Sequence, residues 1–349
     1  MSIDRTVFIK AGRPFEWRGI TAFRLAELIA HGRETEAVAY LDWARKQQLT
    51  VVRVLAMATH LFELKPDEGL KALPRLLSLA ADRGLVVEVV ALADTAGIAI
   101  DLEQHVKAVA AIAAAHPNAV LEIANEPFHP TQDARLHDPA FVKSLAELVP
   151  GSVPVALGSG DGDDGYGAAG RYATWHAPRD DAPDGWGHVL ELATGAALIA
   201  KLQKPLVSDE PIGAADVHEP GRRDNEPARF AAAAAVTRLA GLGATFHYEG
   251  GLQGRLPTGR ELECFNAWNS ALAAFADLPA GGRFVAAAEL SDVGVVTGAR
   301  AFFGRRFDAE AWIVAIDPVK VGVQWRAEWR ERNRSSLPGV ELFRVSRLP

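Results

Sequence analysis

The chain has 349 residues, of which 49% are hydrophobic and 23% charged, so it can bury the core of one large domain or of two ordinary ones. Its formal net charge of -7 argues against a nucleic-acid partner, because such a partner normally meets a basic protein face. The single cysteine, Cys264, excludes an intrachain disulfide and a thiolate metal cluster. We expect Cys264 to be a small buried hydrophobic residue.

No apolar run reaches the roughly 18 residues that cross a bilayer, so we expect no membrane partner. The first residues, 1–12, lack the uninterrupted apolar segment of a secretory signal. These features favour a cytoplasmic location. A secreted mature form, or a module of a larger assembly, would share them.

Strand-like runs recur along most of the chain, and they are near-continuous in Val, Ile and Leu, as in strands buried on both faces of a sheet. They lie at residues 15–20, 50–55, 85–92, 119–124, 153–157, 172–175, 205–208 and 244–248. Helical patterns lie between and after them, at 34–48, 69–82, 102–116, 139–148, 188–201, 226–242 and 259–275. Alternating strands and helices predict a parallel sheet with right-handed crossovers. Eight such units, in roughly the 250 residues typical of the fold, predict a (β/α)8 TIM barrel.

An open doubly wound sheet is the alternative architecture. No G-x-G-x-x-G motif follows a predicted strand, so we expect no dinucleotide domain and no cofactor. The run 158–167 is rich in Gly and Asp and predicts a loop. Its acids do not follow the calcium-loop pattern, and we expect no metal there.

The pattern changes after residue 278. Short strands are predicted at 284–289, 294–297, 311–316 and 340–345, with turns between them. We therefore expect a barrel over residues 1–278 and a small β-rich C-terminal domain over 279–349, packed on the barrel. The arginines of this domain, such as Arg330 and Arg334, are expected to form a solvated face.

Two segments carry the chemistry. The segment 120–127 and the segment 204–211 are apolar strands that stop at Glu126 and Glu210. Residues at the carboxyl ends of barrel strands face the active site, so these two carboxylates should share one mouth. Such a pair, at about 5–5.5 Å, is what cleavage of a glycosidic bond with retention needs. The neighbouring Asp209 is expected to turn away from the mouth, on the opposite face of its strand.

The Asn-Glu-Pro at residues 125–127 resembles the signature of the (β/α)8 clan of retaining glycoside hydrolases, which includes cellulase and mannanase families and family 5. The segment Lys204-Pro205-Leu206-Val207-Ser208-Asp209-Glu210 looks like the strand-seven motif of the same clan. The likeness spans residues 15–275, including 19–23 in the first strand and its loop. It implies that Glu126 is the acid/base, that Asn125 binds the sugar 2-hydroxyl, that Glu210 is the nucleophile and that Arg53 contacts Glu210.

The chain departs from the clan in two places. Strand six often supplies a Tyr that contacts the nucleophile, whereas this chain has Trp175 and His176, so His176 would have to serve. Strand eight usually ends in a Trp that floors the sugar site, and here it is absent. Tyr248, Trp175 or Trp186 could replace it, because aromatic rings pack on sugar faces.

Three classes of function remain open on the sequence. The first is a retaining glycosidase that acts on a β-linked oligo- or polysaccharide. The second is a catalytically silent barrel that binds a glycan or another partner. The third is a metal-dependent hydrolase that uses His60, Asp94, His176 and His247, although no two of these histidines have the close spacing of a ligand pair.

Overall fold

The computed structural model describes residues 1–158, 165–179 and 184–348. The chain forms two compact units. The barrel unit holds residues 1–177, 198–211 and 243–257, and the second unit holds 178–197, 212–242 and 258–349. Most of the Gly/Asp-rich run predicted as a loop lies outside the described residues. The predicted domain boundary after residue 278 stays a prediction.

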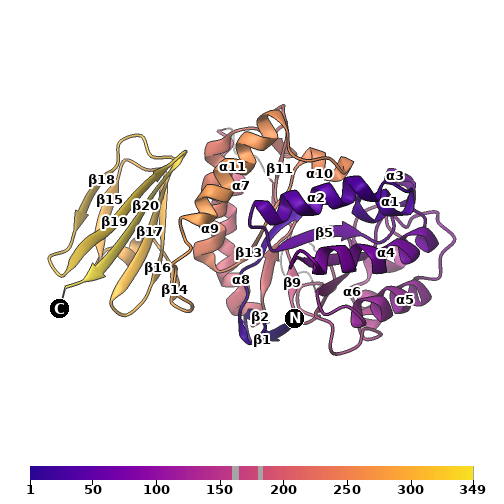
Figure 1. Cartoon of the computed structure of the whole chain (residues 1–349). Helices are drawn as coiled ribbons and strands as arrows, with labels where there is room; N and C mark the ends of the chain where they lie inside the picture. The colour runs from indigo at the N-terminus through magenta and orange to yellow at the C-terminus, as the bar shows by residue number, and fades with distance from the viewer. Residues whose placement is uncertain (159–164, 180–183, 349) are drawn as a thin grey trace. The chain divides into compact units, whose positions relative to one another are not determined.

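The barrel unit contains an 8-stranded parallel sheet in the order β8-β7-β6-β5-β4-β13-β10-β9. Figure 1 labels three of its strands, β5, β9 and β13. The first barrel strand, β4, pairs with both the second, β5, and the last, β13. The sheet therefore curls into a nearly closed barrel, which confirms the predicted (β/α)8 fold. The strands are β4 (Arg18–Thr21), β5 (Val51–Leu55), β6 (Val86–Leu92), β7 (Ala119–Ala124), β8 (Val155–Ala156), β9 (Ala173–Thr174), β10 (Leu206–Ser208) and β13 (Gly243–Phe246).

An N-terminal sheet of three strands, not expected from the sequence, supplies the floor of the barrel core. Its strands are β1 (Ser2–Asp4), β2 (Val7–Lys10) and β3 (Arg13–Pro14). Phe8 of β2 packs on Trp17 and Tyr172, with ring centroids 5.0 and 5.4 Å away. These three rings share one buried cluster with residues near the starts of the barrel strands, namely Val51, Val86, Val120, Ala156 and Val207.

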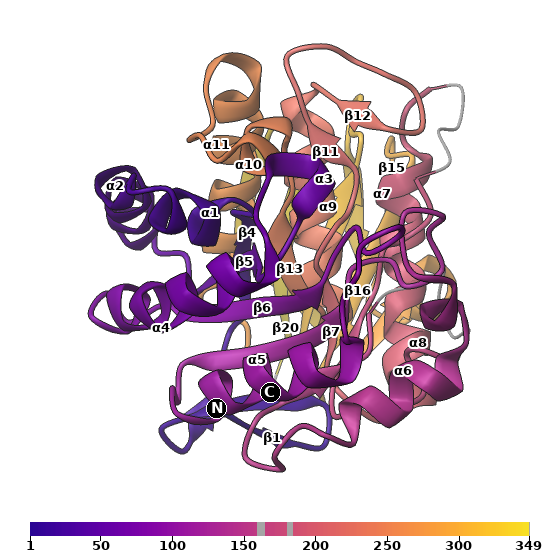
Figure 2. The same cartoon turned by 90° about the vertical axis from the view of Figure 1, so that its right-hand side faces the viewer.

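Helices cover the outside of the barrel strands. In Figure 2, α4 (Pro66–Ala81) and α5 (Leu102–Ala114) lie along β6 and β7. The side chain of Asp101 caps α5 by accepting a hydrogen bond from the Gln104 amide at 3.0 Å. The other helices of this unit are α1 (Leu25–Ala30), α2 (Glu34–Lys46), α3 (Thr59–Phe62), α6 (Pro139–Ala146) and α10 (Glu249–Gln253), while α8 (Gly195–Leu202) begins in the second unit.

In the second unit, α9 (Pro227–Ala240) packs along α11 (Gly259–Ala273), and α7 (Gly187–Glu191) packs on α9. Cys264 of α11 is buried, as expected, and burial raises the pKa of its thiol to about 12. Two short strands, β11 (Gly213–Ala214) and β12 (Arg223–Asp224), form a parallel pair.

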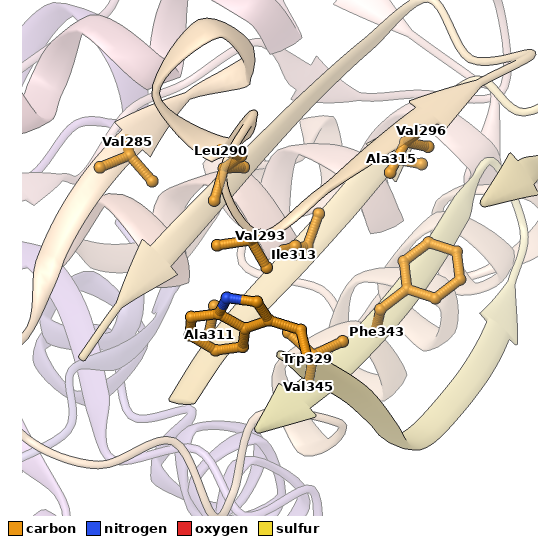
Figure 3. Close-up of a cluster of buried hydrophobic side chains, with 10 residues drawn as sticks. All are labelled: Val285, Leu290, Val293, Val296, Ala311, Ile313, Ala315, Trp329, Phe343 and Val345. Carbon is orange, nitrogen blue, oxygen red and sulfur yellow. The ribbon is translucent and has the colours of Figure 1, made fainter. Parts of the chain in front are cut away.

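The C-terminal part of the second unit is an antiparallel sheet in the order β14-β16-β17-β20-β19, beside the pair β15 and β18. Its core includes Trp329 and Phe343 (Figure 3). Three of its strands, β16, β18 and β19, were not predicted. The bounds are β14 (Arg283–Ala286), β15 (Gly294–Thr297), β16 (Ala301–Arg306), β17 (Glu310–Ile316), β18 (Gly322–Trp325), β19 (Trp329–Leu337) and β20 (Val340–Arg347).

Among the residues that the structure describes, no helix combines the length and the apolar character needed to cross a membrane.

Candidate active site

Two glutamates meet just beyond the ends of β7 and β10. An oxygen of Glu126, an oxygen of Glu210 and a ring nitrogen of His176 all lie within 4.8 Å of one another. The side chain of Glu126 is 24% exposed and that of Glu210 is 9% exposed. The pair therefore combines a close carboxylate spacing with access from solvent on the Glu126 side.

The backbone at Glu126 is strained. Its φ is +43°, in the left-handed region that side chains other than glycine rarely adopt. Strain of this kind survives where surrounding structure holds it, and it concentrates at functional sites. Here it follows the last residue of β7 by two positions and directs the Glu126 side chain to His176, whose Nδ1 lies 3.0 Å from Oε1.

Arg53 of β5 is fully buried and holds the Glu210 side of the site. Its Nη1 donates to Glu210 Oε2 at 2.8 Å, and its Nη2 donates to Asn125 Oδ1 at 2.8 Å and to Glu122 Oε2 at 2.9 Å. Its guanidinium carbon lies 5.2 Å from the ring centre of Phe23. A guanidinium fixed by several charged hydrogen bonds has one orientation, so Glu210 is fixed as well.

A layer of charge fills the barrel below this site. Side chains along a barrel strand point alternately inward and outward. A residue two positions after one that packs in the floor cluster therefore also points into the barrel. In β6 and β7 these residues are Glu88 and Glu122, and both are fully buried. Burial, together with the charges of Asp209 and Glu122, raises the pKa of Glu88 well above its usual value. Burial also raises the pKa of Glu122 to about 7, against the opposing charge of Arg53.

Asp209 belongs to this inward layer, so the expectation that it turns away was wrong. It is fully buried, and its Oδ2 lies 3.1 Å from Arg53 Nε. The reason is alternation, because Val207 of the same strand faces the floor cluster and Asp209 lies two positions later. Glu210 follows the end of β10 by two residues, and the chain beyond the strand brings it to Arg53 too.

His176 lies between the carboxylates and is itself buried. Its Nε2 is 3.6 Å from Asp209 Oδ1 and 3.8 Å from Glu210 Oε2. Burial alone would lower the pKa of His176, but Glu210 and Asp209 outweigh it and raise the pKa to about 10. The imidazole is therefore a cation at neutral pH.

The three aromatic residues predicted to meet a sugar are all buried. Tyr248 is 0% exposed, and its hydroxyl lies 2.8 Å from that of Tyr40 and donates to the carbonyl of Arg255. Trp175 is 3% exposed. Trp186 belongs to the second unit, where it is buried and Arg300 lies 5.8 Å from its ring centre. The burial of Tyr248 and Trp175 speaks against an open sugar floor formed by these two rings.

The residues of the metal-hydrolase alternative do not form one cluster. His60 Nε2 lies 3.2 Å from the Ala96 carbonyl, and Asp94 accepts from the His60 amide at 3.1 Å. His247 instead contacts Thr21, with its Nδ1 2.9 Å from the hydroxyl. Within the described part of the chain, the groups that could hold a metal are Glu126 with His176 and Glu210, and Glu88 with Glu122 and Asp209.

Glu88 and Glu122 were not predicted from the sequence as part of the site. The signal was present, because each is an acid in the middle of an otherwise apolar strand, Val-Val-Glu-Val-Val-Ala-Leu and Ala-Val-Leu-Glu-Ile-Ala. A parallel strand that is buried on both faces has no solvent for a carboxylate, so such an acid must find a cation inside the protein.

Comparison with known proteins gives the fold a family context. No family model matches the chain, and no curated protein matches it. Among solved structures, a chain titled glycoside hydrolase matches with a TM-score of 0.67 and 12% identity, over 98% of this chain and 95% of that one. A glycoside hydrolase family 5 structure from Bacteroides vulgatus matches with a TM-score of 0.64 and 12% identity, over 98% and 92%.

A third match is a β-glucanase from Saccharophagus degradans, whose structure is a complex with cellotetraose. It has a TM-score of 0.59 and 11% identity, over 78% of this chain and 92% of that one. The chain thus has a (β/α)8 fold like that of the family 5 glycoside hydrolases, together with a C-terminal antiparallel sheet.

Proposed function

We propose that this protein is a retaining glycoside hydrolase that cleaves a β-linked oligo- or polysaccharide by double displacement. The observation that carries the proposal is the pair Glu126 and Glu210, because a carboxylate oxygen of one lies within 4.8 Å of a carboxylate oxygen of the other. Retaining enzymes hold their two carboxyl groups about 5–5.5 Å apart, whereas inverting enzymes leave about 6.5–9.5 Å for a water. The likeness in fold to glycoside hydrolases supports the same reaction class.

Glu210 is the nucleophile in this proposal. Its hydrogen bond from Arg53 favours the ionised form, which is the form that attacks the anomeric carbon. The bond from Arg53 also fixes the attacking oxygen, so little ordering remains to be done when substrate binds.

Glu126 is the acid/base. It is more exposed than Glu210, as suits a group that first gives a proton to the leaving oxygen and later takes one from water. Asn125 Oδ1 accepts a hydrogen bond from Arg53, so the Nδ2 group of the same amide is the one that can donate to the sugar 2-hydroxyl. His176 takes the place of the strand-six tyrosine beside Glu210.

The burial of the aromatic side chains does not favour the sugar contacts expected of them from the sequence. Tyr248 and Trp175 are buried in the free protein, so a sugar would reach them only if side chains above them moved. We therefore propose that polar groups around Glu126, rather than an exposed aromatic floor, supply most of the binding at the cleaved bond.

A trapping experiment tests the nucleophile. A 2-fluoro glycoside with a good leaving group slows both steps, because fluorine withdraws electrons from the developing cation. A panel of such gluco- and manno-configured reagents should add one sugar to the protein, and peptide mapping should find it on Glu210.

The matched control is Glu210→Gln, which should remain unlabelled. Labelling of Asp209 would show that the roles of the two adjacent acids were assigned the wrong way round. If no reagent labels the protein, and a screen of aryl β-glycosides, β-glucans and mannans gives no hydrolysis, the proposal fails in favour of a silent glycan-binding barrel.

A further inference from the structure

Asp209 is held in an unusual way for a buried carboxylate. It is fully buried, and its two contacts with cations are Oδ2 to Arg53 Nε at 3.1 Å and Oδ1 to His176 Nε2 at 3.6 Å. Among the residues that the structure describes, neither oxygen makes a hydrogen bond of good geometry. A carboxylate in such a place is stable only while its cationic partners stay charged. Asp209 and His176 are therefore coupled in their protonation.

The other side of His176 faces the proposed acid/base. Its Nδ1 lies 3.0 Å from Glu126 Oε1, while Nε2 lies 3.8 Å from Glu210 Oε2. The ring thus bridges both proposed catalytic carboxylates with Asp209 behind it. Whether the ring carries one proton or two decides how much positive charge Glu126 experiences.

The charge around His176 changes during double displacement. In the first half, a Glu210 oxygen bonds to the anomeric carbon, the bond to the leaving oxygen breaks, and that oxygen takes the proton of Glu126. Glu210 is then an uncharged ester, so His176 has lost one of its anionic neighbours. Glu126 must remain ionised to take a proton from water. If His176 passed its own proton to Glu126 at this stage, the base would be neutralised.

We propose that Asp209 is a positioning residue that keeps His176 an imidazolium in both halves of the reaction, so that Glu126 alone exchanges protons with the leaving group and with water. This inference rests on the proposed function. Asp209 suits the task because it lies below Glu210 in the barrel, fully buried, and is not consumed when the sugar ester forms.

Other charged groups also act on His176, and Asp209→Asn leaves them in place. Glu126 follows β7 and Glu210 follows β10, and both contact the ring directly. Glu122, on β7, interacts with the ring charge from below. Arg53 opposes these acids, and His247 Nε2 lies 4.0 Å from Glu210 Oε1. The substitution therefore removes one anion from a defined set.

An NMR titration of imidazole nitrogens tests the inference without any substrate. Full-length protein with nitrogen-15 histidine is titrated, and His176→Gln identifies the signal of His176. In the wild type, His176 should stay doubly protonated to at least about pH 9. In Asp209→Asn its midpoint should fall by about one to three pH units, the range for loss of an opposite charge at 4–6 Å. Asp209→Glu, which keeps the charge, should restore most of the shift.

Asp224→Asn is the matched control. Asp224 is also a fully buried carboxylate beside a histidine and an arginine, His188 and Arg229, but it lies in the second unit. Its substitution should leave the His176 midpoint unchanged. A wild-type midpoint near 6.5 would overturn the inference even if Asp209→Asn does not fold, and so would an unchanged midpoint in a folded Asp209→Asn.

Kinetics give the second readout. On an aryl glycoside whose sugar ester accumulates, kcat reports the second half and kcat/KM the first. Asp209→Asn should lower kcat at least tenfold more than kcat/KM. The reason is that the charge of Glu210 still stabilises the His176 imidazolium in the first half of the reaction, but not once Glu210 is an ester. The variant should also lose kcat at alkaline pH, with a midpoint at the lowered titration midpoint of His176. Equal losses in both constants would overturn the role in the second half. An Asp209-dependent titration in a protein without glycosidase activity would instead refute the proposed function and support the link between Asp209 and His176.

Discussion

Arg53→Met is the sharpest test of what holds the barrel interior together. Methionine fills a similar length but leaves Glu122, Asp209 and Glu210 without the cation that now contacts all three. Removing one partner of a buried ion pair costs about 3–5 kcal/mol, because the remaining charge is left uncompensated. A folded chain has only about 5–15 kcal/mol of stability in total. We therefore expect Arg53→Met to lose about a fifth or more of the free energy of unfolding at pH 7.

Urea unfolding followed by circular dichroism measures this loss. The size of the loss should also depend on pH. The orphaned carboxylates would have raised pKa values in the folded variant, so the folded state binds protons more readily than the unfolded one. The deficit relative to the wild type should therefore shrink as the pH falls from 7 to 5. Arg53→Lys, which keeps the charge but not the planar fork, should lose less. Stability of Arg53→Met within about 1 kcal/mol of the wild type at pH 7 would contradict a stabilising role of Arg53 for the buried carboxylates.

Three further predictions concern the site and the core. Glu126→Ala should lose far more activity on substrates with poor leaving groups than on activated aryl glycosides, which need little proton donation, and equal losses would argue against Glu126 as the acid. The folded pKa of Glu122 is raised from 4.5 to about 7, so its contribution to stability is lost as the pH rises through that window. Glu122→Gln should therefore show a smaller fall in Tm between those pH values, and an identical fall would contradict the assignment. The thiol of Cys264, with a pKa of about 12 and no exposure, should react with a thiol reagent at pH 8 only after unfolding, and rapid labelling of the native protein would show that its helix opens.

The barrel itself was predictable from the sequence because its strands are buried on both faces. The run at 119–124 was expected with the bounds that β7 has, and β5 and β6 begin within one residue of the expectation. Runs of Val, Ile and Leu between helical patterns have few alternatives, so local pattern and overall fold agree there.

The strands that were not predicted are those whose hydrophobic pattern in the sequence does not match their burial in the structure. Strand β19 alternates arginine with other polar residues and is mostly exposed, so it lacks the apolar signal of a strand. The N-terminal strands are two to four residues long, and Phe8 reveals their role only through its packing on Trp17 and on Tyr172, which is distant in sequence. Single-sequence periodicity does not detect such contacts.

The site was predicted in part, for the same physical reasons. Glu126, Glu210 and Arg53 were placed in one barrel mouth from the strand ends and the family resemblance, and the structure brings their side chains together. Asp209 was misplaced because alternation was counted from the glutamate rather than from Val207, the residue that faces the barrel floor. The sugar contact predicted for Tyr248 stays a prediction, and the structure shows that its hydroxyl lies 2.8 Å from that of Tyr40 inside the protein.

The configuration of the first product reports whether Glu210 or water attacks the anomeric carbon. A substrate of known β-configuration is hydrolysed in an NMR tube, and the anomeric proton of the new reducing end is recorded before mutarotation. The short spacing of Glu126 and Glu210 predicts that the β-anomer appears first. Initial release of the α-anomer would contradict the account, because it would mean that water, and not Glu210, attacks the anomeric carbon.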